Sequence, residues 1–281
     1  MAKKNSPTKR LKELVDGPEA TLDLAEAALV IAQEEYTDLH IVAYLRRLDE
    51  LAETVRARSA PDAPPENIIA TMNHLLFKEQ GFSGNANDYY DARNSFLNEV
   101  LDRRLGIPIT LSILYMEVGW RLGLPLEGIS FPGHFLVKLP LKRGEVVLDP
   151  YCDGISLSEE DLRRRLLQTY GEEDADIPLE RLLTTASKKE ILVRMLRNLK
   201  DSYLRTEELP KALAAVDRML LIMPDLTDEV RDRGLLYERL ECVHAALADF
   251  RRYLELKPDA SDAAHIRNRI IELQRRAAAL H

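Results

Sequence analysis

The chain has 281 residues, of which 46% are hydrophobic and 31% are charged, and it carries a net charge of -8 with a pI of about 5.4. This length and composition predict a soluble protein of about two domains. The acidic balance argues against nonspecific binding to nucleic acid or to anionic membranes, because both require a basic surface.

Residues 1–20 are a basic exception within this acidic chain. Their positive charges are Lys3, Lys4, Lys9, Arg10 and Lys12. Because no aromatic residues alternate with these charges, we expect a flexible, solvated end of the chain rather than an arm that binds nucleic acid.

Neither a membrane segment nor a cysteine framework is predicted. No apolar region follows the basic start, and no apolar run approaches the roughly 18 residues that span a bilayer. We therefore expect a cytoplasmic protein. The two cysteines, Cys152 and Cys242, lie far apart in the sequence, which argues against a disulfide framework and against a Cys-rich metal site.

A helical segment is predicted before the central part of the chain. Residues 21–57 contain two stretches with a helical spacing of apolar residues, and residues 36–38 separate them. The proline-rich residues 60–65 then stop helix formation, and residues 68–78 resume it.

Residues 81–88 form a predicted loop, rich in residues that tolerate unusual backbone angles. The loop leads to Tyr90, Asn94 and Asn98, just before the next helix. Loops of this kind often line functional sites, so we treat these three residues as candidate binding residues. The alternative is that the asparagines close the loop by hydrogen bonding to the backbone.

The central helix is predicted to begin at Pro108, which fits the first helical position because its missing N–H would have no partner there. Apolar residues keep a helical spacing up to Leu122, and Gly123 provides a C-terminal stop. A buried helix of about four turns follows from this pattern.

Short apolar runs after this helix predict antiparallel strands. They cover residues 126–131, 134–139 and 146–148, with tight connections at residues 132–133 and 142–144. His134 opens one strand and Asp149 closes the next, so the two side chains can face each other. An Asp that accepts from one ring nitrogen of a His leaves the other nitrogen free to act as a base on a thiol or hydroxyl.

Two segments of the sequence resemble the SirB-type family. Residues 94–138 read NSFLNEVLDRRLGIPITLSILYMEVGWRLGLPLEGISFPGHFLVK, and residues 148–150 read LDP. Members of that family carry a degenerate transglutaminase-like domain followed by tetratricopeptide repeats. The resemblance extends from about Asp23 to the C-terminus. It implies an α+β fold in which a papain-like core helix packs with a small antiparallel sheet.

The resemblance also implies a Cys-His-Asp triad, in which His134 and Asp149 take the second and third positions. The nucleophile position then falls at the entrance of the central helix, residues 106–112. This helix entrance reads GIPITLS and contains no thiol. The ancestral chemistry needs a Cys there, because the partial positive charge of a helix N-terminus stabilises a thiolate.

Other nucleophiles are weaker candidates. The hydroxyl of Thr110 or Ser112 attacks poorly at neutral pH unless a base lies within hydrogen-bond reach, and Cys152 lacks a position at a helix N-terminus. We therefore expect an inactive or repurposed site. The alternative is a hydrolase or acyltransferase that uses one of these three side chains, with His134 as the base and Asp149 as its orienter. No ligand spacing predicts a metal or cofactor.

The C-terminal third contains an internal repeat. Tyr203 recurs as Tyr237, Val216 recurs as Phe250, and Ala and Pro residues recur with the same period of about 34 residues, which is typical of tetratricopeptide repeats. Lys200 is an exception, because it stands where the repeat prefers Gly.

These patterns predict three regions: residues 1–20 as the flexible end, residues 21–180 as the transglutaminase-like domain, and residues 181–281 as helical repeats, of which residues 261–280 form a capping helix. We expect the repeats to bind a protein partner and the chain to act in recognition or regulation, without nucleic-acid or membrane partners.

Overall fold

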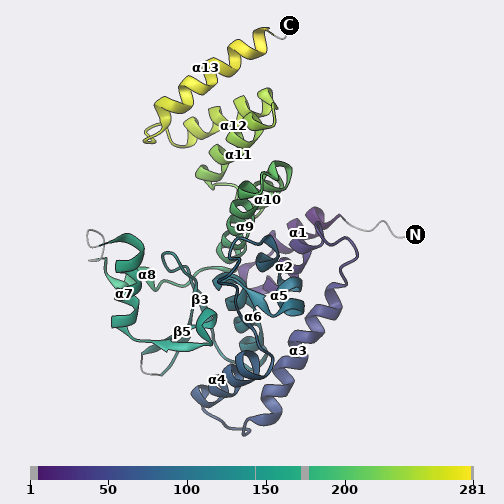
Figure 1. Cartoon of the computed structure of the whole chain (residues 1–281), viewed down its shortest axis with the longest axis vertical. Helices are drawn as coiled ribbons and strands as arrows, with labels where there is room; N and C mark the ends of the chain where they lie inside the picture. Colours follow the sequence, from purple (N-terminus) through teal and green to yellow (C-terminus); the bar gives the residue numbers. More distant parts are fainter. Residues whose placement is uncertain (1–5, 143, 172–176, 280–281) are drawn as a thin grey trace. The chain divides into compact units, whose positions relative to one another are not determined.

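The computed structural model of the chain describes residues 6–142, 144–171 and 177–279. Its contacts divide the chain into two compact units, residues 1–195 and residues 196–281. The first unit combines helices with small β-sheets and the second is helical, which confirms the predicted α+β class with a helical C-terminal module (Figure 1). Lys3 and Lys4 of the basic segment, and residue 143 of the predicted connection 142–144, lie outside the described residues.

The helical segment predicted before the central helix is present, with its breaks. The helices of the first unit are α1 (Pro7–Val15), α2 (Leu24–Ala32), α3 (Ile41–Arg58), α4 (Pro65–Asn73), α5 (Leu97–Arg103), α6 (Pro108–Arg121), α7 (Glu159–Tyr170) and α8 (Leu179–Leu182). A π-helix, η2 (His74–Glu79), continues α4, and single 3-10 turns form η1 (Glu19–Thr21), η3 (Ala92–Ser95) and η4 (Pro150–Cys152).

Helix α1 lies within the segment that the sequence analysis expected to be flexible. The side chain of Ser6 caps it by accepting a hydrogen bond from the Lys9 N–H. Leu11 and Val15 are one helical turn apart and both are buried, and α1 packs against α2. The physical reason for the difference is this apolar pair, since it gives the basic segment a face to bury.

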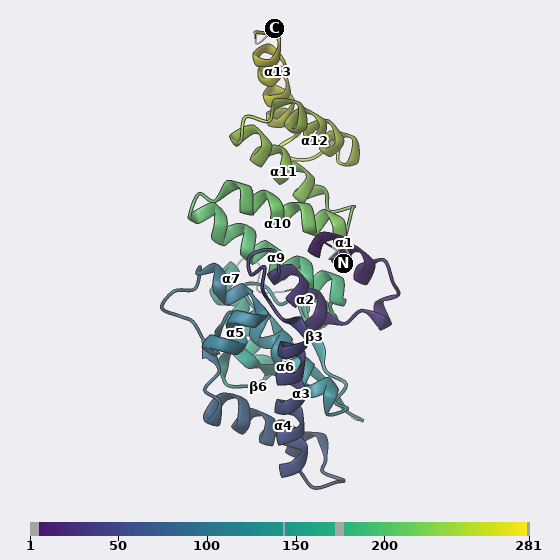
Figure 2. The same ribbon diagram turned by 90° about the vertical axis from the view of Figure 1, so that its right-hand side faces the viewer.

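Helix α6 is the buried centre of the first unit, as its sequence predicts. Every residue from Pro108 to Gly119 is buried. The helix ends before Gly123, whose φ of +81° is the left-handed conformation that favours glycine at this position. The long helix α3 packs along α6 (Figure 2).

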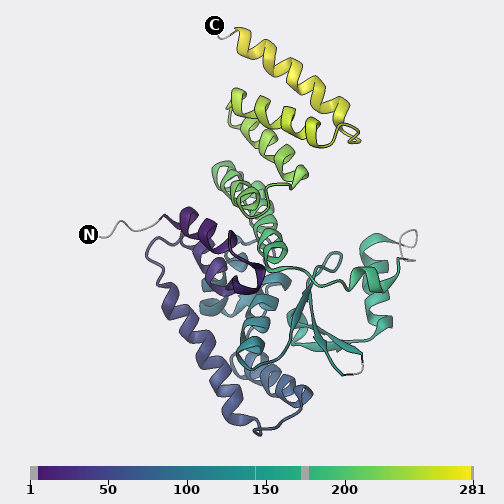
Figure 3. The ribbon, with the colours of Figure 1, turned by 180° about the vertical axis from the view of Figure 1, so that it is seen from behind.

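The main sheet contains four antiparallel strands in the order β3 (Glu127–Ile129), β4 (Leu136–Pro140), β5 (Glu145–Asp149) and β6 (Ile155–Leu157). It lies between α6 and α7 (Figure 3). Ile129, Leu136 and Val147 of the sheet form a buried cluster with Leu162 and Leu166 of α7. The sequence analysis predicted the first three strands but not β6 or α7.

A second sheet consists of two short parallel strands, β1 (Ser83–Gly84) and β2 (Leu105–Gly106). It joins the predicted loop to the helix entrance, because β2 ends immediately before α6. Its two strands are too short to give a detectable alternation of apolar residues, which is why the sequence pattern did not predict them.

The helices of the second unit follow the predicted repeat. They are α10 (Leu209–Ile222), α11 (Thr227–Arg239), α12 (Val243–Leu256) and α13 (Ala263–Ala279), and they are preceded by α9 (Lys188–Arg205). The division between the units falls inside α9, whereas the sequence analysis placed a boundary between residues 180 and 181. A helix that continues through a boundary leaves no proline or glycine signal to mark it.

The exceptional Lys200 has a structural explanation within the second unit. In the second repeat, a Cβ atom on Gly234 would lie 2.7 Å from the ring of Phe250, so the aromatic ring requires the glycine. In the first repeat the corresponding residues are Lys200 and the smaller Val216. The buried Lys200 ammonium bonds to Glu229 at 2.8 Å and to Asp232 at 2.7 Å, and so connects α9 to α11.

The close packing of Gly234 against Phe250 predicts a strong coupling between these positions. Gly234→Ala is expected to lower the free energy of unfolding. Overpacking costs about 1–3 kcal/mol, and this cost exceeds the gain of about 1 kcal/mol in helix propensity. In a Phe250→Val background the same substitution is expected to stabilise the chain. Urea denaturation of the four proteins of this cycle measures the coupling, and additive effects would contradict the explanation.

Candidate functional site

The structure brings His134 and Asp149 into contact, as the sequence predicts. Nε2 of His134 lies 2.9 Å from Oδ1 of Asp149. Asp149 is the last residue of β5, while His134 precedes β4 by two residues instead of opening the strand. The side chain of Asp149 is fully buried and that of His134 is 15% exposed. When the ring is neutral, Nε2–H donates to the ionised Asp149 and Nδ1 is left as the acceptor nitrogen.

Asp149 has two further polar partners. The backbone N–H of Tyr151 donates to Oδ1 at 3.0 Å, and the Arg165 guanidinium lies 2.6 Å from Oδ2. Burial by itself raises the pKa of this carboxyl, but the hydrogen bond and charge of His134 and the charge of Arg165 outweigh it and lower the pKa to about 2. The carboxylate is therefore held in its charged form.

Arg165 is a site residue that the sequence analysis missed. It belongs to a run of three arginines on α7, of which Arg163 and Arg164 pair with Glu159 and Glu160 on the surface. The sequence does not distinguish Arg165 from Arg163, because the two flank the buried Leu162 and Leu166 symmetrically around the helix, and only the contact with Asp149 identifies it.

Cys152 lies near the same cluster, with its Sγ 4.0 Å from Arg165. Burial raises the pKa of this thiol, and the charge of Asp149 raises it further, while Arg165 acts in the opposite direction with a smaller effect. A nucleophilic cysteine needs the reverse, namely a lowered pKa. The environment of Cys152 therefore disfavours the thiolate.

The two hydroxyls of the helix entrance are committed to the backbone. Thr110 Oγ1 donates to the carbonyl of Asn94 at 2.7 Å and accepts from the N–H of Ile107 at 3.2 Å. Ser112 Oγ donates to the carbonyl of Phe135 at 3.5 Å. Both side chains are fully buried. Within the described residues, neither hydroxyl forms a hydrogen bond to His134.

Asn94 closes the loop that precedes α5. Loop closure by hydrogen bonds to the backbone was the alternative to a binding role for this residue. Its Nδ2 donates to the carbonyls of Asp88 and Tyr89 at 2.7 and 3.2 Å, and its Oδ1 accepts from Asn85 at 3.1 Å. Both asparagines of this network are buried. A network of this kind fixes the loop against the start of α6, because the Asn94 carbonyl is also the acceptor of Thr110.

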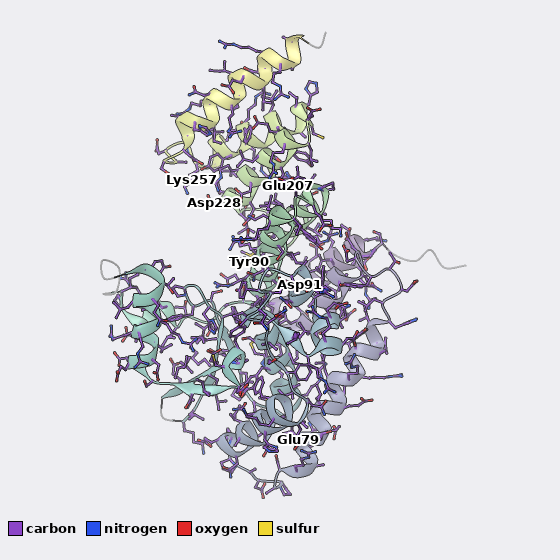
Figure 4. All side chains as sticks on the ribbon, in the orientation of Figure 1. Glu79, Tyr90, Asp91, Glu207, Asp228 and Lys257 are labelled. Atoms are coloured by element: carbon purple, nitrogen blue, oxygen red, sulfur yellow. The ribbon has the colours of Figure 1, made fainter. Side chains whose placement is uncertain are left out.

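The other two candidate binding residues differ in exposure. Asn98 is 2% exposed in the first turn of α5, and its Oδ1 has no hydrogen-bond partner among the residues that the structure describes. Tyr90 (Figure 4) is 46% exposed. Its ring meets that of Tyr89 edge-on, with 5.2 Å between the centroids. Of the three candidates in this segment, Tyr90 is therefore the only one that is exposed.

Tyr151 connects His134 to the helix entrance, a role that the sequence analysis did not predict. Its ring meets the imidazole edge-on, with 5.7 Å between the centroids. A Cβ atom on Gly84 would lie 2.3 Å from the same ring, so Tyr151 packs directly on β1. Because Gly84 pairs with Gly106, strand β1 links this aromatic ring to the helix entrance.

Searches of the described residues found neither a helix that is long and apolar enough to cross a membrane nor a group of three or more His, Cys, Asp or Glu side chains placed to hold a metal ion.

Comparison with known proteins gives two family matches. Residues 42–197 match the transglutaminase-like superfamily, and residues 199–270 match a tetratricopeptide repeat model. No solved structure matches the chain.

Similar curated proteins extend over most of the chain. A UPF0162 protein of Xylella fastidiosa strain Temecula1 is 40% identical, over 93% of this chain and 93% of its own length. The UPF0162 protein PA3419 of Pseudomonas aeruginosa is 33% identical over 89% and 90%. Protein SirB1 of Salmonella typhimurium strain LT2 is 28% identical over 84% and 86%.

The depressed pKa of Asp149 predicts how its contribution to stability depends on pH. Its folded pKa of about 2 lies below the ordinary value of 3.8, so the ionised carboxylate stabilises the fold above about pH 4, and this contribution is lost as the pH falls towards 2. We expect Asp149→Asn to lower the free energy of unfolding by about 2 kcal/mol at pH 7, and by progressively less below pH 4.

Urea denaturation between pH 7 and pH 2.5 measures this difference. Glu160→Gln is the matched control, because that carboxylate is 85% exposed and its removal is expected to change stability little at any pH. A difference between wild type and Asp149→Asn that stayed constant with pH would contradict the assignment.

Proposed function

Because this chain belongs to the transglutaminase-like superfamily and carries a tetratricopeptide repeat region after that domain, we propose that it acts in protein recognition or regulation without performing acyl transfer. The observation that carries the proposal is the state of the helix entrance, where Thr110 and Ser112 are buried and bonded to backbone carbonyls.

Acyl transfer by a triad requires a nucleophile that the histidine can deprotonate. The helix entrance offers no thiol, and each hydroxyl would first have to break its hydrogen bond to a carbonyl and then turn towards His134. Leaving a buried acceptor unsatisfied costs about 1–3 kcal/mol, in addition to the low intrinsic reactivity of a hydroxyl. These costs support the proposal that the site does not catalyse acyl transfer.

The His134–Asp149 pair then serves the fold or the binding of a partner. A fully buried carboxylate is destabilising unless it is paired and hydrogen-bonded, and here the imidazole, Arg165 and a backbone N–H supply those partners. The pair therefore has a physical role that is independent of catalysis.

The repeats support the recognition part of the proposal. Tetratricopeptide repeats stack helix pairs into extended surfaces that commonly bind other proteins. On the second unit of this chain, exposed charges such as Asp228 and Lys257, 3.8 Å apart, join α11 to α12 at the surface (Figure 4). A surface of this polarity suits a reversible protein contact more than a permanent one.

A second candidate function is a hydrolase or acyltransferase that uses Thr110, Ser112 or Cys152 as the nucleophile. The contact of His134 with Asp149 favours it, because a carboxylate on Nε2 fixes the tautomer and leaves Nδ1 free to act as a base. The raised pKa of Cys152 and the burial of both hydroxyls weigh against it.

Activity-based probes distinguish the two functions. On the full-length chain, we expect a fluorophosphonate to leave Thr110 and Ser112 unlabelled, because both hydroxyls are buried. We expect iodoacetamide to alkylate Cys152 slowly, at the same rate in His134→Ala, because burial and the charge of Asp149 raise the pKa of this thiol and His134 is not among the causes. Mass spectrometry of the labelled peptides gives the sites and rates. His74→Ala is the matched control, since that side chain is 66% exposed.

The opposite pattern would establish the second function. It would consist of labelling at one of the three candidate nucleophiles that disappears in His134→Ala and persists in His74→Ala.

A deletion tests the role of the repeats. We expect the full-length chain to recover protein partners from cell extract that a chain without residues 196–281 does not recover, because the repeats provide the binding surface. Circular dichroism of both proteins checks that the first unit remains folded. Equal recovery by two folded proteins would remove the repeats from the proposal.

A further inference from the structure

A chain of hydrogen bonds reaches Asp149 from α4 and α6. Asn73 is the last residue of α4, directly before the π-helix η2. Its Oδ1 accepts from the hydroxyl of Tyr115 at 2.7 Å, and its Nδ2 donates to the carbonyl of Gly154 at 2.9 Å. The N–H of Gly154 in turn donates to the carbonyl of Asp149 at 2.8 Å.

The chemistry of the partners fixes the orientation of the Asn73 amide. A backbone carbonyl only accepts, so the NH₂ group must face Gly154. The carbonyl oxygen of the side chain then faces Tyr115, whose hydroxyl must donate. Tyr115 is fully buried on α6 and its ring stacks on Phe77 of η2 at 6.1 Å, so the amide is anchored to the core.

The turn after Asp149 is shaped by this contact. Asp153 and Gly154 both adopt the left-handed conformation, with φ of 56° and 70°. A Cβ atom on Gly154 would lie 2.4 Å from Oδ1 of Asn73, so the turn is pressed directly against the amide. The ammonium of Lys78, on the exposed side of η2, adds a second link to Asp153 at 2.5 Å.

The same turn sets the direction of the Asp149 carboxylate. Within the turn, Tyr151 donates its N–H to Oδ1 of Asp149, the oxygen that also meets His134. Its last residue, Gly154, holds the Asp149 backbone carbonyl. A shift of Gly154 would therefore move both the backbone of Asp149 and the N–H that orients its carboxylate.

We infer that Asn73 is a positioning residue for the His134–Asp149 pair. It ties the turn of residues 149–154 to the buried Tyr115 and so holds the carboxylate where it meets Nε2. The inference rests on the proposed function only in taking this pair as the preserved part of the site, and it requires neither a nucleophile nor an identified partner.

Two variants separate this role from general stability. Asn73→Asp keeps the shape of the side chain and its acceptor for Tyr115, but it replaces the NH₂ donor with an oxygen that faces the Gly154 carbonyl. Tyr115→Phe removes only the hydroxyl that anchors the amide. Asn67→Asp makes the same change of charge at an exposed position of α4 and is the matched control.

The measurement is the solvent exchange of the His134 ring N–H in the full-length chain, observed by NMR with ¹⁵N-labelled histidine and assigned by its loss in His134→Gln. We expect this proton to exchange slowly in the wild type, because it is bonded to a buried carboxylate. It should exchange at least about tenfold faster in Asn73→Asp, to a smaller extent faster in Tyr115→Phe, and at the wild-type rate in Asn67→Asp.

Unchanged exchange in the first two variants, with α6 amides still protected, would overturn the inference. So would a change of equal size in Asn67→Asp, because the effect would then be one of charge at a distance. If Asn73→Asp does not fold, Tyr115→Phe decides the question alone. Probe labelling that depends on His134 would reject the proposed function and leave this result unaffected, so the two failures are distinguishable.

Discussion

The first unit is organised around a carboxylate that has no access to water. Asp149 is fully buried and ionised, and a buried charge of this kind is stable only with well-placed partners. Its partners come from separate parts of the fold: the loop before β4 supplies His134, α7 supplies Arg165, and the turn after β5 supplies the N–H of Tyr151. The packing of α7 on the sheet and the path of the chain after β5 thus place two of the three partners of this group.

The local features of this arrangement were readable from the sequence, and the distant ones were not. Pro108 and Gly123 mark the ends of α6, and the hairpin pattern brings His134 to Asp149, because these signals act over a few residues. Arg165 and Asn73 contact the site from helices whose sequence gives no reason to single them out. Their roles depend on which face of each helix meets the sheet or the turn, and that is decided by tertiary packing.

The helix entrance and the repeats each combine a feature that is visible in the sequence with a contact that only the folded structure reveals. At the entrance, the absence of a thiol is evident in the sequence, but the commitment of Thr110 to the Asn94 carbonyl appears only when the loop folds against α6. In the repeats, the period is evident in the sequence, and Lys200 is an exception to it. The bonds of Lys200 to Glu229 and Asp232 explain this exception. In both cases a contact between residues that are distant in the sequence explains how the fold accommodates the residue.

The burial of Asp149 also determines which substitutions this fold can tolerate during evolution. A cysteine at a helix entrance can be replaced by a residue that packs, with little effect on folding. Loss of His134 or Arg165 instead leaves the buried Asp149 charge with one partner fewer, and loss of Asp149 leaves its two side-chain partners without the carboxylate. Under the proposed function, the stability of the fold is then a sufficient reason for the chain to keep His134 and Asp149 without a reaction to perform. The presence of His134 and Asp149 in this chain is therefore weak evidence that it performs acyl transfer.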